Sequence, residues 1–324
     1  MSREEITGFL GDDWIAVQTL IADALRSDIG LLNIVNSQIL AHGGKMLRPM
    51  VTLLAAGACS GGRIGDDSRR YAAAAELLHN ATLLHDDVAD ESDVRRGEPT
   101  MRLRLGPSRA VLVGDFWLSK AVDLILEAES RDSVKKIFSK TLSDLAEGEM
   151  LQLEKAGAAD TSEKEYFRII YCKTASLFET AGMSGAISVG APAEYVAAAK
   201  EYSDALGIAF QIKDDILDYA GDGELGKPVG IDLLEKKITL PLLCAMKDSP
   251  RESEIRKMVL AIDAHPEYCE EIRKFVAERG GVEAAGEILN QYVDKALEAL
   301  NALPESRYTA YLAEIARFNS IRNK

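Results

Sequence analysis

The chain has 324 residues, of which 47% are apolar and 28% charged, and its formal net charge is −14. This much apolar material can bury a large core, which excludes a disordered or fibrous protein. The acidic balance excludes a sequence-independent nucleic-acid binder and disfavours anionic membrane surfaces as partners, because both need a basic face. It also argues against anionic ligands, although net charge does not determine the charge of one site.

The sequence predicts no stable membrane insertion. No stretch approaches the roughly 18 apolar residues of a membrane span, and the first segment, MSREEITGFLGDD, is acidic where a secretory signal would be basic. The four cysteines form no C-x-x-C pair, so we interpret them as reduced, packed residues rather than disulfides or a zinc site. We therefore expect a cytoplasmic protein. The cysteines are Cys59, Cys172, Cys244 and Cys269.

Helical periodicity dominates the chain, and apolar residues rarely alternate with polar ones. Pro49, Pro192, Pro241 and Pro304 each stand at the start of an apolar-periodic run, where a first-turn proline is tolerated. No Ser-, Gly- or Pro-rich linker divides the chain, so we predict one all-α domain over residues 1–324, a bundle of about 10–13 helices. The expected helices cover residues 12–30, 31–42, 49–60, 66–90, 108–130, 132–156, 162–190, 192–221, 239–248, 251–264, 266–279, 281–302 and 304–320.

Two segments depart from the helical pattern. Residues 41–49, AHGGKMLRP, contain a Gly-Gly turn with Lys45 and Arg48, and residues 221–240 are rich in Gly and Lys. Each segment is compatible with an ordinary interhelical loop, and a lone Gly-Lys pair is more often just that. Their function depends on what they face.

The helix expected over residues 66–90 ends in an acidic motif, LLHDDVAD. Asp86 and Asp90 are four residues apart, so both carboxylates project from one helix face, about one turn apart. His79 and Thr82 or Leu83 continue the same face. The opposite face is apolar and predicts a packing stripe of Leu77, Ala81, Leu84 and Val88.

A second helix repeats this device as AFQIKDDILDY, with Asp214 and Asp218 four apart and Asp215 beside the first. One such motif is ordinarily a solvated helix end. However, acids at i,i+4 repel and oppose the helix dipole, and the second motif lies among apolar residues, where an uncompensated carboxylate is costly. Divalent cations would relieve both costs. Oxygen ligands without a His or Cys cluster indicate Mg²⁺ rather than zinc.

Mg²⁺ usually takes one or two protein carboxylates and completes its shell with water and phosphate oxygens. Two such helices facing each other would hold a diphosphate through bridging ions. Basic residues follow each motif and suit phosphate oxygens. They are Arg95 and Arg96 after the first, and Lys227 and Lys237 after the second.

From about residue 40 to 245 the chain resembles the trans-isoprenyl diphosphate synthases, the polyprenyl synthetase family. The likeness comprises, in order, GGKMLRP (43–49), LLHDDVAD (83–90), RRGEPT (95–100), GDF (114–116), KTASLF (173–178), AFQIKDDILDY (209–219) and GKPVGIDLLEKKITLP (226–241). The resemblance implies an all-α isoprenoid synthase fold around a deep central cavity, and a homodimer.

The resemblance also implies roles for individual residues. About two or three Mg²⁺ ions per site would hold the allylic diphosphate, bound by Asp86, Asp90 and Asp214 with support from Asp87, Asp215 and Asp218. The allylic diphosphate would also contact Arg95, Lys173, Lys227 and Lys237. Isopentenyl diphosphate would be held by Lys45, Arg48, His79 and Arg96. The developing allylic cation would lie beside Thr174 and Gln211.

Three polar features have competing interpretations. His79 taken alone is typical of a packed histidine, but its place on the Asp86 face favours substrate contact. His85 has no assigned role. The acidic run over residues 147–154 is interpreted as a solvated or supporting face rather than a third metal site.

The implied reaction is an ionisation, condensation and elimination. Metal and basic contacts stabilise the departing diphosphate while the allylic C–O bond ionises. The alkene of isopentenyl diphosphate then attacks the cation and a proton is lost. No side-chain nucleophile is needed.

Product length depends on the residues just before the first motif. Ala81 lies five residues before Asp86, about 7.5 Å along the helix, and Thr82 lies four before it. Short-chain members of the family commonly carry bulky aromatics here, so the small residues predict a product longer than C15, with geranylgeranyl diphosphate as the alternative to a medium or long chain. Phe116 and Trp117 could form a lower floor or belong to the core.

Two alternatives come from other classes. A class I terpene cyclase would share the fold and the first motif, but its second metal motif usually carries Asn, Ser and Glu ligands. Cyclases also line their sites with aromatics, and only 6% of this chain is aromatic. A non-catalytic partner subunit of a prenyl synthase would normally have degraded acidic motifs, and both motifs are complete here.

Overall fold

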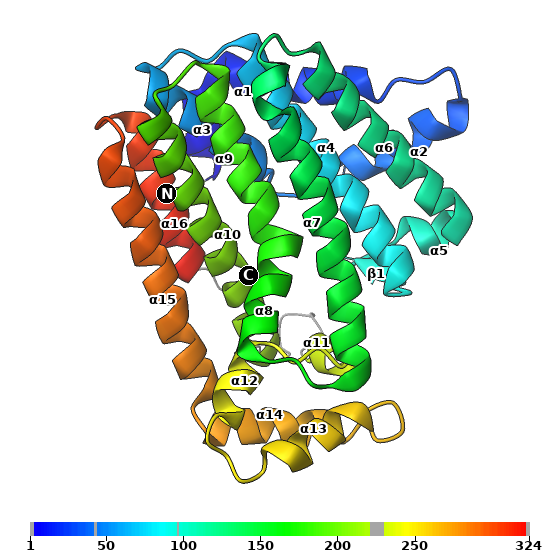
Figure 1. Ribbon diagram of the computed structural model, residues 1–324. Coiled ribbons are helices and arrows are strands. Elements are labelled where there is room, and N and C mark those ends of the chain that lie inside the picture. Colours follow the sequence, from blue (N-terminus) through cyan, green and yellow to red (C-terminus); the bar gives the residue numbers. More distant parts are fainter. Residues whose placement is uncertain (1–2, 42–43, 96, 221–229, 322–324) are drawn as a thin grey trace. The chain divides into compact units, whose positions relative to one another are not determined.

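The protein is described by a computed structural model covering residues 3–41, 44–95, 97–220 and 230–321, with side chains described through residue 318 (Figure 1). Sixteen α-helices, one π-helix, one 3-10 helix and one two-stranded hairpin make up the regular structure of these residues. The prediction of an all-α fold is therefore confirmed. The described helices outnumber the expected ones because α5 (Met101–Leu105) and α11 (Ile231–Leu234) are too short for periodicity to reveal them. In addition, a π-helix divides the run expected over residues 162–190 into α8 (Glu163–Ile170) and α9 (Ser176–Ser188).

The described residues divide into two compact units. The first unit draws on segments 1–140, 177–203 and 299–314, and the second on segments 141–176, 204–298 and 315–324. The assignment of residues 1–324 to a single domain stays a prediction.

In the first unit, α4 is the central helix and packs against α1, α3 and α6. Its middle section is its most deeply buried part, with Tyr71, Ala73 and Leu77 all at 0% exposure, whereas Asp66 at its start is exposed and Asp86 and Asp90 at its other end are half-buried. Figure 1 shows α4 and α6 running side by side. The helices of this unit include α1 (Arg3–Ala24), α2 (Gly30–Ala41), α3 (Leu47–Ser60), α4 (Asp66–Ala89), α5 (Met101–Leu105), α6 (Pro107–Glu127) and most of α9 (Ser176–Ser188).

The first helix departs from its predicted bounds of 12–30. Gly11 adopts the non-helical angles φ 51° and ψ −122°, so a helix that the sequence did not predict runs from Arg3 to this kink, and the helix after it starts where predicted but ends at Ala24. Ile6 and Leu10 then belong to the same buried stripe as the residues beyond the kink.

A short hairpin follows α4, where the sequence predicted no regular structure. Strand β1 (Val94–Arg95) pairs antiparallel with β2 (Glu98–Pro99). Thr100 then caps α5, because its hydroxyl accepts a hydrogen bond from the Leu103 N–H at 3.2 Å. The hairpin thereby holds the segment after the first acidic motif.

The second unit contains the C-terminal part of α10 and the helices around it. Its core includes Ile212 and Ile216 of α10, packed with Leu240 and Leu289. Figure 1 shows α13 and α14 as neighbours beside α12. The remaining elements are α7 (Arg131–Ala158), α8 (Glu163–Ile170), the π-helix η1 (Tyr171–Ala175), α10 (Ala193–Ala220), α11 (Ile231–Leu234), α12 (Leu240–Met246), α13 (Glu252–Leu260), α14 (Tyr268–Glu278), α15 (Gly281–Ala299), the 3-10 helix η2 (Leu300–Ala302) and α16 (Arg307–Ile321).

Two further expectations concern the whole chain. In the ranges that the structure covers, no helix combines the length and apolar character needed to span a bilayer. All four cysteines are free thiols, with Cys59 and Cys172 buried, which agrees with their interpretation as reduced, packed residues.

Candidate active site

The first acidic motif occupies the C-terminal end of α4. Asp86 and Asp87 lie in its last turn, and Asp90 is the C-cap residue, whose N–H donates to the Asp86 carbonyl at 2.8 Å. No basic residue lies in that turn, so the acids meet the negative end of the helix dipole uncompensated within the helix. The opposite face is buried as predicted, through Leu77, Ala81 and Leu84.

Asp87 is the buried member of this motif, at 5% exposure. The Arg95 Nε of the hairpin donates to its Oδ1 at 2.6 Å. Burial raises the pKa of Asp87, and nearby Asp90 adds to that shift, while Arg95 opposes it. The backbone carbonyl of Asp87 also accepts the Ser92 N–H at 3.0 Å. Asp87 thus joins the helix end to the basic hairpin.

The GGKMLRP and KTASLF motifs meet within the first unit. Arg48 of α3 is 7% exposed, and its guanidinium carbon lies 4.5 Å from the centre of the Phe178 ring of α9. Met46, which precedes α3, adopts the left-handed φ of 52°, and Lys45 beside it is exposed. The fold therefore holds Arg48 firmly and leaves Lys45 at the surface.

The residues predicted to set product length lie within α4. Ala81 is 1% exposed, and the Thr82 hydroxyl donates to the His79 carbonyl at 2.8 Å. Trp117 is 1% exposed and its Nε1 donates to Asn36 Oδ1 of α2 at 2.8 Å, so it belongs to the core. Phe116 is half-buried, with the Lys120 ammonium 5.6 Å from its ring centre.

The second acidic motif ends α10, and Asp215 is its buried member at 2% exposure. Both of its carboxylate oxygens are bound by neutral donors. Tyr166 Oη donates to Oδ2 at 2.5 Å, and Gln211 Nε2 donates to Oδ1 at 2.9 Å. Burial, with Asp214 and Asp218 nearby, raises the pKa of Asp215 to about 7 against the effect of these hydrogen bonds.

A polar chain runs from Asp215 to the KTASLF motif. Gln211 Oε1 accepts from the Thr174 hydroxyl at 2.7 Å, so the amide orientation is set at both of its ends. Thr174 lies in η1, and π-helical segments of this kind occur frequently at functional sites. Thr174 and Gln211, predicted to lie together, are in direct contact.

Lys173, also in η1, forms an ion pair with Glu149 of α7. Gln152 donates to the same glutamate at 3.3 Å. The backbones of α7 and η1 approach closely here, since a Cβ at Gly148 would lie 3.1 Å from the backbone nitrogen of Lys173. Glu149 and Gln152 therefore support Lys173, which agrees with the interpretation of this acidic run as a solvated or supporting face. Glu147 and Glu154 of the same run are exposed.

Asp218 holds the segment that follows the second motif. Its carboxylate accepts the N–H groups of Ile231 at 3.1 Å and Asp232 at 3.2 Å, and its carbonyl accepts the Gly230 N–H at 3.1 Å. Burial and the nearby Asp215 and Asp218 raise the pKa of Asp232 well above its usual range. Lys237 forms an ion pair with Glu235.

Sequence reasoning missed Tyr166, Asp232 and the pairing partner of Lys173. Tyr166 stands seven residues before Lys173, which gives no hint of contact with an aspartate 49 residues further along the chain. Asp232 lies in a segment that looked like a lysine-rich loop. Arg96 and Lys227 lie outside the described residues.

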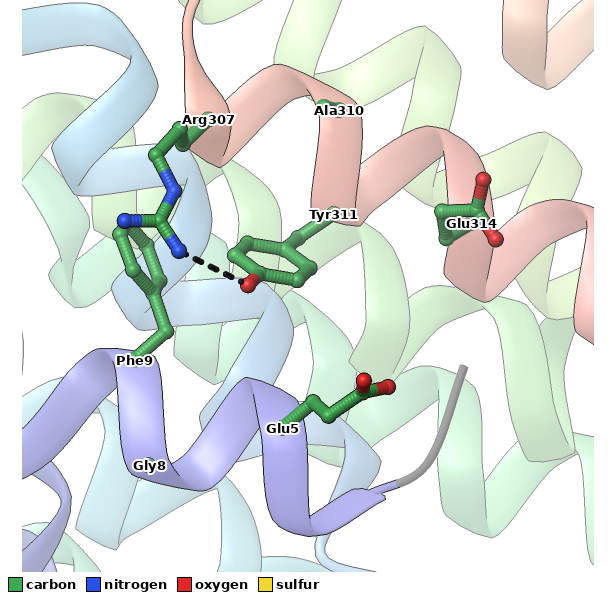
Figure 2. Close-up of a pocket in the computed structure, with 7 residues that line it drawn as sticks. All are labelled: Glu5, Gly8, Phe9, Arg307, Ala310, Tyr311 and Glu314. Atoms are coloured by element: carbon green, nitrogen blue, oxygen red, sulfur yellow. Dashed lines mark hydrogen bonds between the residues drawn. The ribbon is translucent and has the colours of Figure 1, made fainter.

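Two observations on possible sites concern the described residues only. No group of three or more His, Cys, Asp and Glu side chains there is arranged as a ready metal cage. Figure 2 shows a groove of about 850 Å³ between α1 and α16, lined by none of the predicted site residues. There the Arg307 guanidinium stacks 4.5 Å from the Phe9 ring centre and donates to Tyr311 Oη at 3.2 Å.

Comparison with known proteins gives consistent matches. A model of the polyprenyl synthetase family matches residues 30–278. The octaprenyl diphosphate synthase of Escherichia coli is 37% identical over 326 residues, covering 100% of both chains. The all-trans-nonaprenyl-diphosphate synthase (geranyl-diphosphate specific) of Rhodobacter capsulatus is 37% identical over 97% of this chain and 96% of that one. A solved structure of a polyprenyl synthase from Caulobacter crescentus, complexed with calcium and isoprenyl diphosphate, has a TM-score of 0.91 at 36% identity, covering 100% of this chain and 98% of that one.

These matches define the class first: the chain has the all-α isoprenoid synthase fold and is a prenyltransferase. It belongs to the polyprenyl synthetase family. The resemblance found in the motifs is thereby confirmed, as is the prediction of a trans-polyprenyl diphosphate synthase. The three relatives are all prenyl diphosphate or polyprenyl synthases by name, and none is named a terpene cyclase.

Proposed function

We propose that this prenyltransferase condenses isopentenyl diphosphate with an allylic diphosphate and depends on Mg²⁺ held by its two aspartate motifs. The observation that carries the proposal is the accumulation of half-buried and buried carboxylates at the C-terminal ends of α4 and α10. Such an arrangement is unfavourable without cations, because burial and the helix dipole both disfavour negative charge there.

The donor set fits Mg²⁺. Every candidate ligand is a carboxylate oxygen, and Asp86, Asp90 and Asp214 are proposed as the ligands of about two or three ions per site. Asp87, Asp215 and Asp218 are proposed as supporting residues, as the family resemblance implies, and each accepts hydrogen bonds from protein donors. The calcium in the Caulobacter crescentus relative supports a divalent ion. When bound, Mg²⁺ would neutralise charge on the leaving diphosphate.

The chain's own residues supply the remaining stabilisation. Arg95, adjacent to the first motif, and Lys173 would donate hydrogen bonds to the departing diphosphate. Lys227 and Lys237 would bind the same group, and Lys45, Arg48, His79 and Arg96 would hold isopentenyl diphosphate. The Thr174 hydroxyl donates a hydrogen bond to Gln211 Oε1. The remaining lone pairs of these two oxygens are available to face the developing allylic cation.

One assay tests the reaction and the cofactor together. Purified protein receives labelled isopentenyl diphosphate, Mg²⁺ and a series of allylic primers from C5 to C20, and products are separated by chain length. We expect product formation with allylic primers, complete loss with excess chelator, and recovery when Mg²⁺ is restored. Undiminished turnover in chelator would refute the metal proposal.

We also propose an all-trans product longer than C15. Ala81 and Thr82 are small and would let a growing chain pass the level where aromatics stop it, and the octaprenyl and nonaprenyl synthases named above support a long product. Ala81→Phe should shorten the product distribution in the same assay. A wild-type protein that stops at C15 with ample isopentenyl diphosphate would contradict the proposal, and geranylgeranyl diphosphate as the main product would support the shorter alternative.

Two finer proposals concern assembly and location. A homodimer is supported by apolar side chains on the outer face of α6, where Leu112 is 65% and Leu126 56% exposed. Light scattering should give twice the monomer mass, and Leu112→Glu should shift the mass toward the monomer. The cytoplasmic location inferred from the reduced cysteines is tested by cell fractionation.

A further inference from the structure

His85 is a motif residue that the proposed reaction leaves without a role. It immediately precedes Asp86, and its ring points to α6 rather than to the face shared by Asp86 and Asp90. Its Nε2 lies 3.3 Å from the Val111 carbonyl and 3.2 Å from Asp115 Oδ1. Both partners are acceptors, so Nε2 carries a proton and donates to them.

The ring of His85 rests directly on the backbone of Gly114, the glycine of the GDF motif. A Cβ at position 114 would lie 2.4 Å from His85 Nε2 and 2.6 Å from Cδ2, closer than side-chain atoms approach. A glycine inside a helix costs about 1 kcal/mol relative to alanine. The position of the ring therefore gives a reason for glycine at this point of α6.

The neighbouring helix is a firm support for this contact. Trp117 of α6 is 1% exposed and is tied to α2 by its hydrogen bond to Asn36. The end of α4 itself is less enclosed, because Asp86 and Asp90 are half-buried while residues 71–78 in the middle of the helix are buried. A contact at His85 thus acts where packing constrains the helix less than at its middle.

We propose that His85, Gly114 and Asp115 form a positioning latch that fixes the rotation of the last turn of α4, and with it the direction of the Asp86 and Asp90 carboxylates. The ring fills the space that Gly114 leaves, and the hydrogen bonds to α6 set its orientation. In this proposal the latch residues act through Asp86 and Asp90 and have no contact of their own with substrate or metal. This inference rests on the proposed role of Asp86 and Asp90 in binding Mg²⁺.

The test is a Gly114→Ala variant compared with Gly57→Ala. Gly57 of α3 is a matched control, since a Cβ there would lie 2.3 Å from the Tyr308 ring and Gly57 is buried in a helix that carries neither acidic motif. Mn²⁺ binding in the presence of inorganic pyrophosphate is measured by electron paramagnetic resonance, alongside the Mg²⁺ concentration for half-maximal turnover and the thermal midpoint.

We expect both variants to lower the thermal midpoint, but only Gly114→Ala to weaken Mn²⁺ binding, by about tenfold, which is typical when residues supporting metal ligands are lost. Turnover of this variant should partly recover at high Mg²⁺. His85→Ala removes the contact without a clash and should weaken binding similarly. His85→Ala combined with Gly114→Ala should weaken it no further, because both changes remove the same contact.

The Asp86→Ala variant distinguishes failure of the latch from failure of the metal proposal. If Asp86→Ala loses Mn²⁺ binding while Gly114→Ala and His85→Ala bind like Gly57→Ala, the latch is refuted and the metal proposal stands. If Asp86→Ala itself binds Mn²⁺ as the wild type does, the metal proposal fails. Should Gly114→Ala not fold, His85→Ala alone decides: normal Mn²⁺ binding by that variant overturns the latch.

Discussion

The ends of α4 and α10 carry the same acidic pattern but balance their buried carboxylate differently. Asp87 is paired with a cation, the Arg95 guanidinium, at 2.6 Å. Asp215 is held by the neutral donors Tyr166 and Gln211, and its pKa is raised to about 7. The end of α4 therefore receives a positive charge beside its buried carboxylate, whereas the buried carboxylate of α10 is held by uncharged donors.

The largest expected effect tests what the two ends share. Asp86→Ala and Asp214→Ala should each lower turnover by about 10³-fold, since each removes electrostatic stabilisation of the leaving diphosphate. Steady-state kinetics at saturating Mg²⁺ measure this loss. Asp12→Ala, on the exposed side of α1, is the control and should keep wild-type turnover. Wild-type turnover in either motif variant would contradict the prediction.

The next prediction concerns the ion pair between Arg95 and Asp87 at the end of α4. Arg95→Met leaves the Asp87 carboxylate buried without its cation, so the free energy of unfolding should fall by about 2 kcal/mol. Urea denaturation without added metal measures the change. Asp87→Asn added to this variant should restore part of the stability, because the unpaired charge is then gone. A fully additive loss in the double variant would contradict the pairing.

A smaller effect is expected at α10. Tyr166→Phe removes one neutral donor from Asp215 and should lower the free energy of unfolding by about 1 kcal/mol. It should also reduce turnover, by about tenfold for an equal loss of transition-state stabilisation, because the Asp215 carboxylate that orients Gln211 loses one of its two donors. Tyr202→Phe is a matched control: this buried hydroxyl donates to the Leu312 carbonyl at 2.7 Å, so it should cost stability but leave turnover unchanged.

The smallest effect concerns salt. Raising NaCl from about 0.1 M to about 1 M shortens the Debye length from about 10 Å to about 3 Å. The stability difference between wild type and Arg95→Met should shrink by about 1 kcal/mol or less, because the Arg95 side chain is 37% exposed. The difference for Tyr166→Phe should stay constant, since both partners are buried. If the stability differences of Arg95→Met and Tyr166→Phe depended equally on salt, the proposed difference between charged and neutral partners would be refuted.

Local signals were sufficient to predict much of the fold. Periodicity located α3, α4 and α10 within a few residues, because their buried stripes extend over many turns. It missed the helix before Gly11 and extended the helix after it beyond its end at Ala24. The two-residue strands and the four-residue α11 have no period long enough to detect.

The site residues that belong to contiguous sequence motifs could be predicted. The i,i+4 spacing placed Asp86 and Asp90 on one face, and the paired positions of Thr174 and Gln211 came from the family resemblance. Contacts made only by the folded chain could not be predicted. Asp218 binds backbone groups 13 and 14 residues later, and the π-helical turn at Lys173 has no residue signature of its own.

The contrast in burial along α4 has a consequence for how this helix opens. Backbone amides around Tyr71 to Leu78 lie among side chains with 0% exposure, so they can exchange with solvent only when much of the first unit unfolds. Amides near Asp86 lie in a half-exposed turn and can exchange through local fraying. One helix thus combines a slowly exchanging middle section with an acidic end whose amides exchange faster.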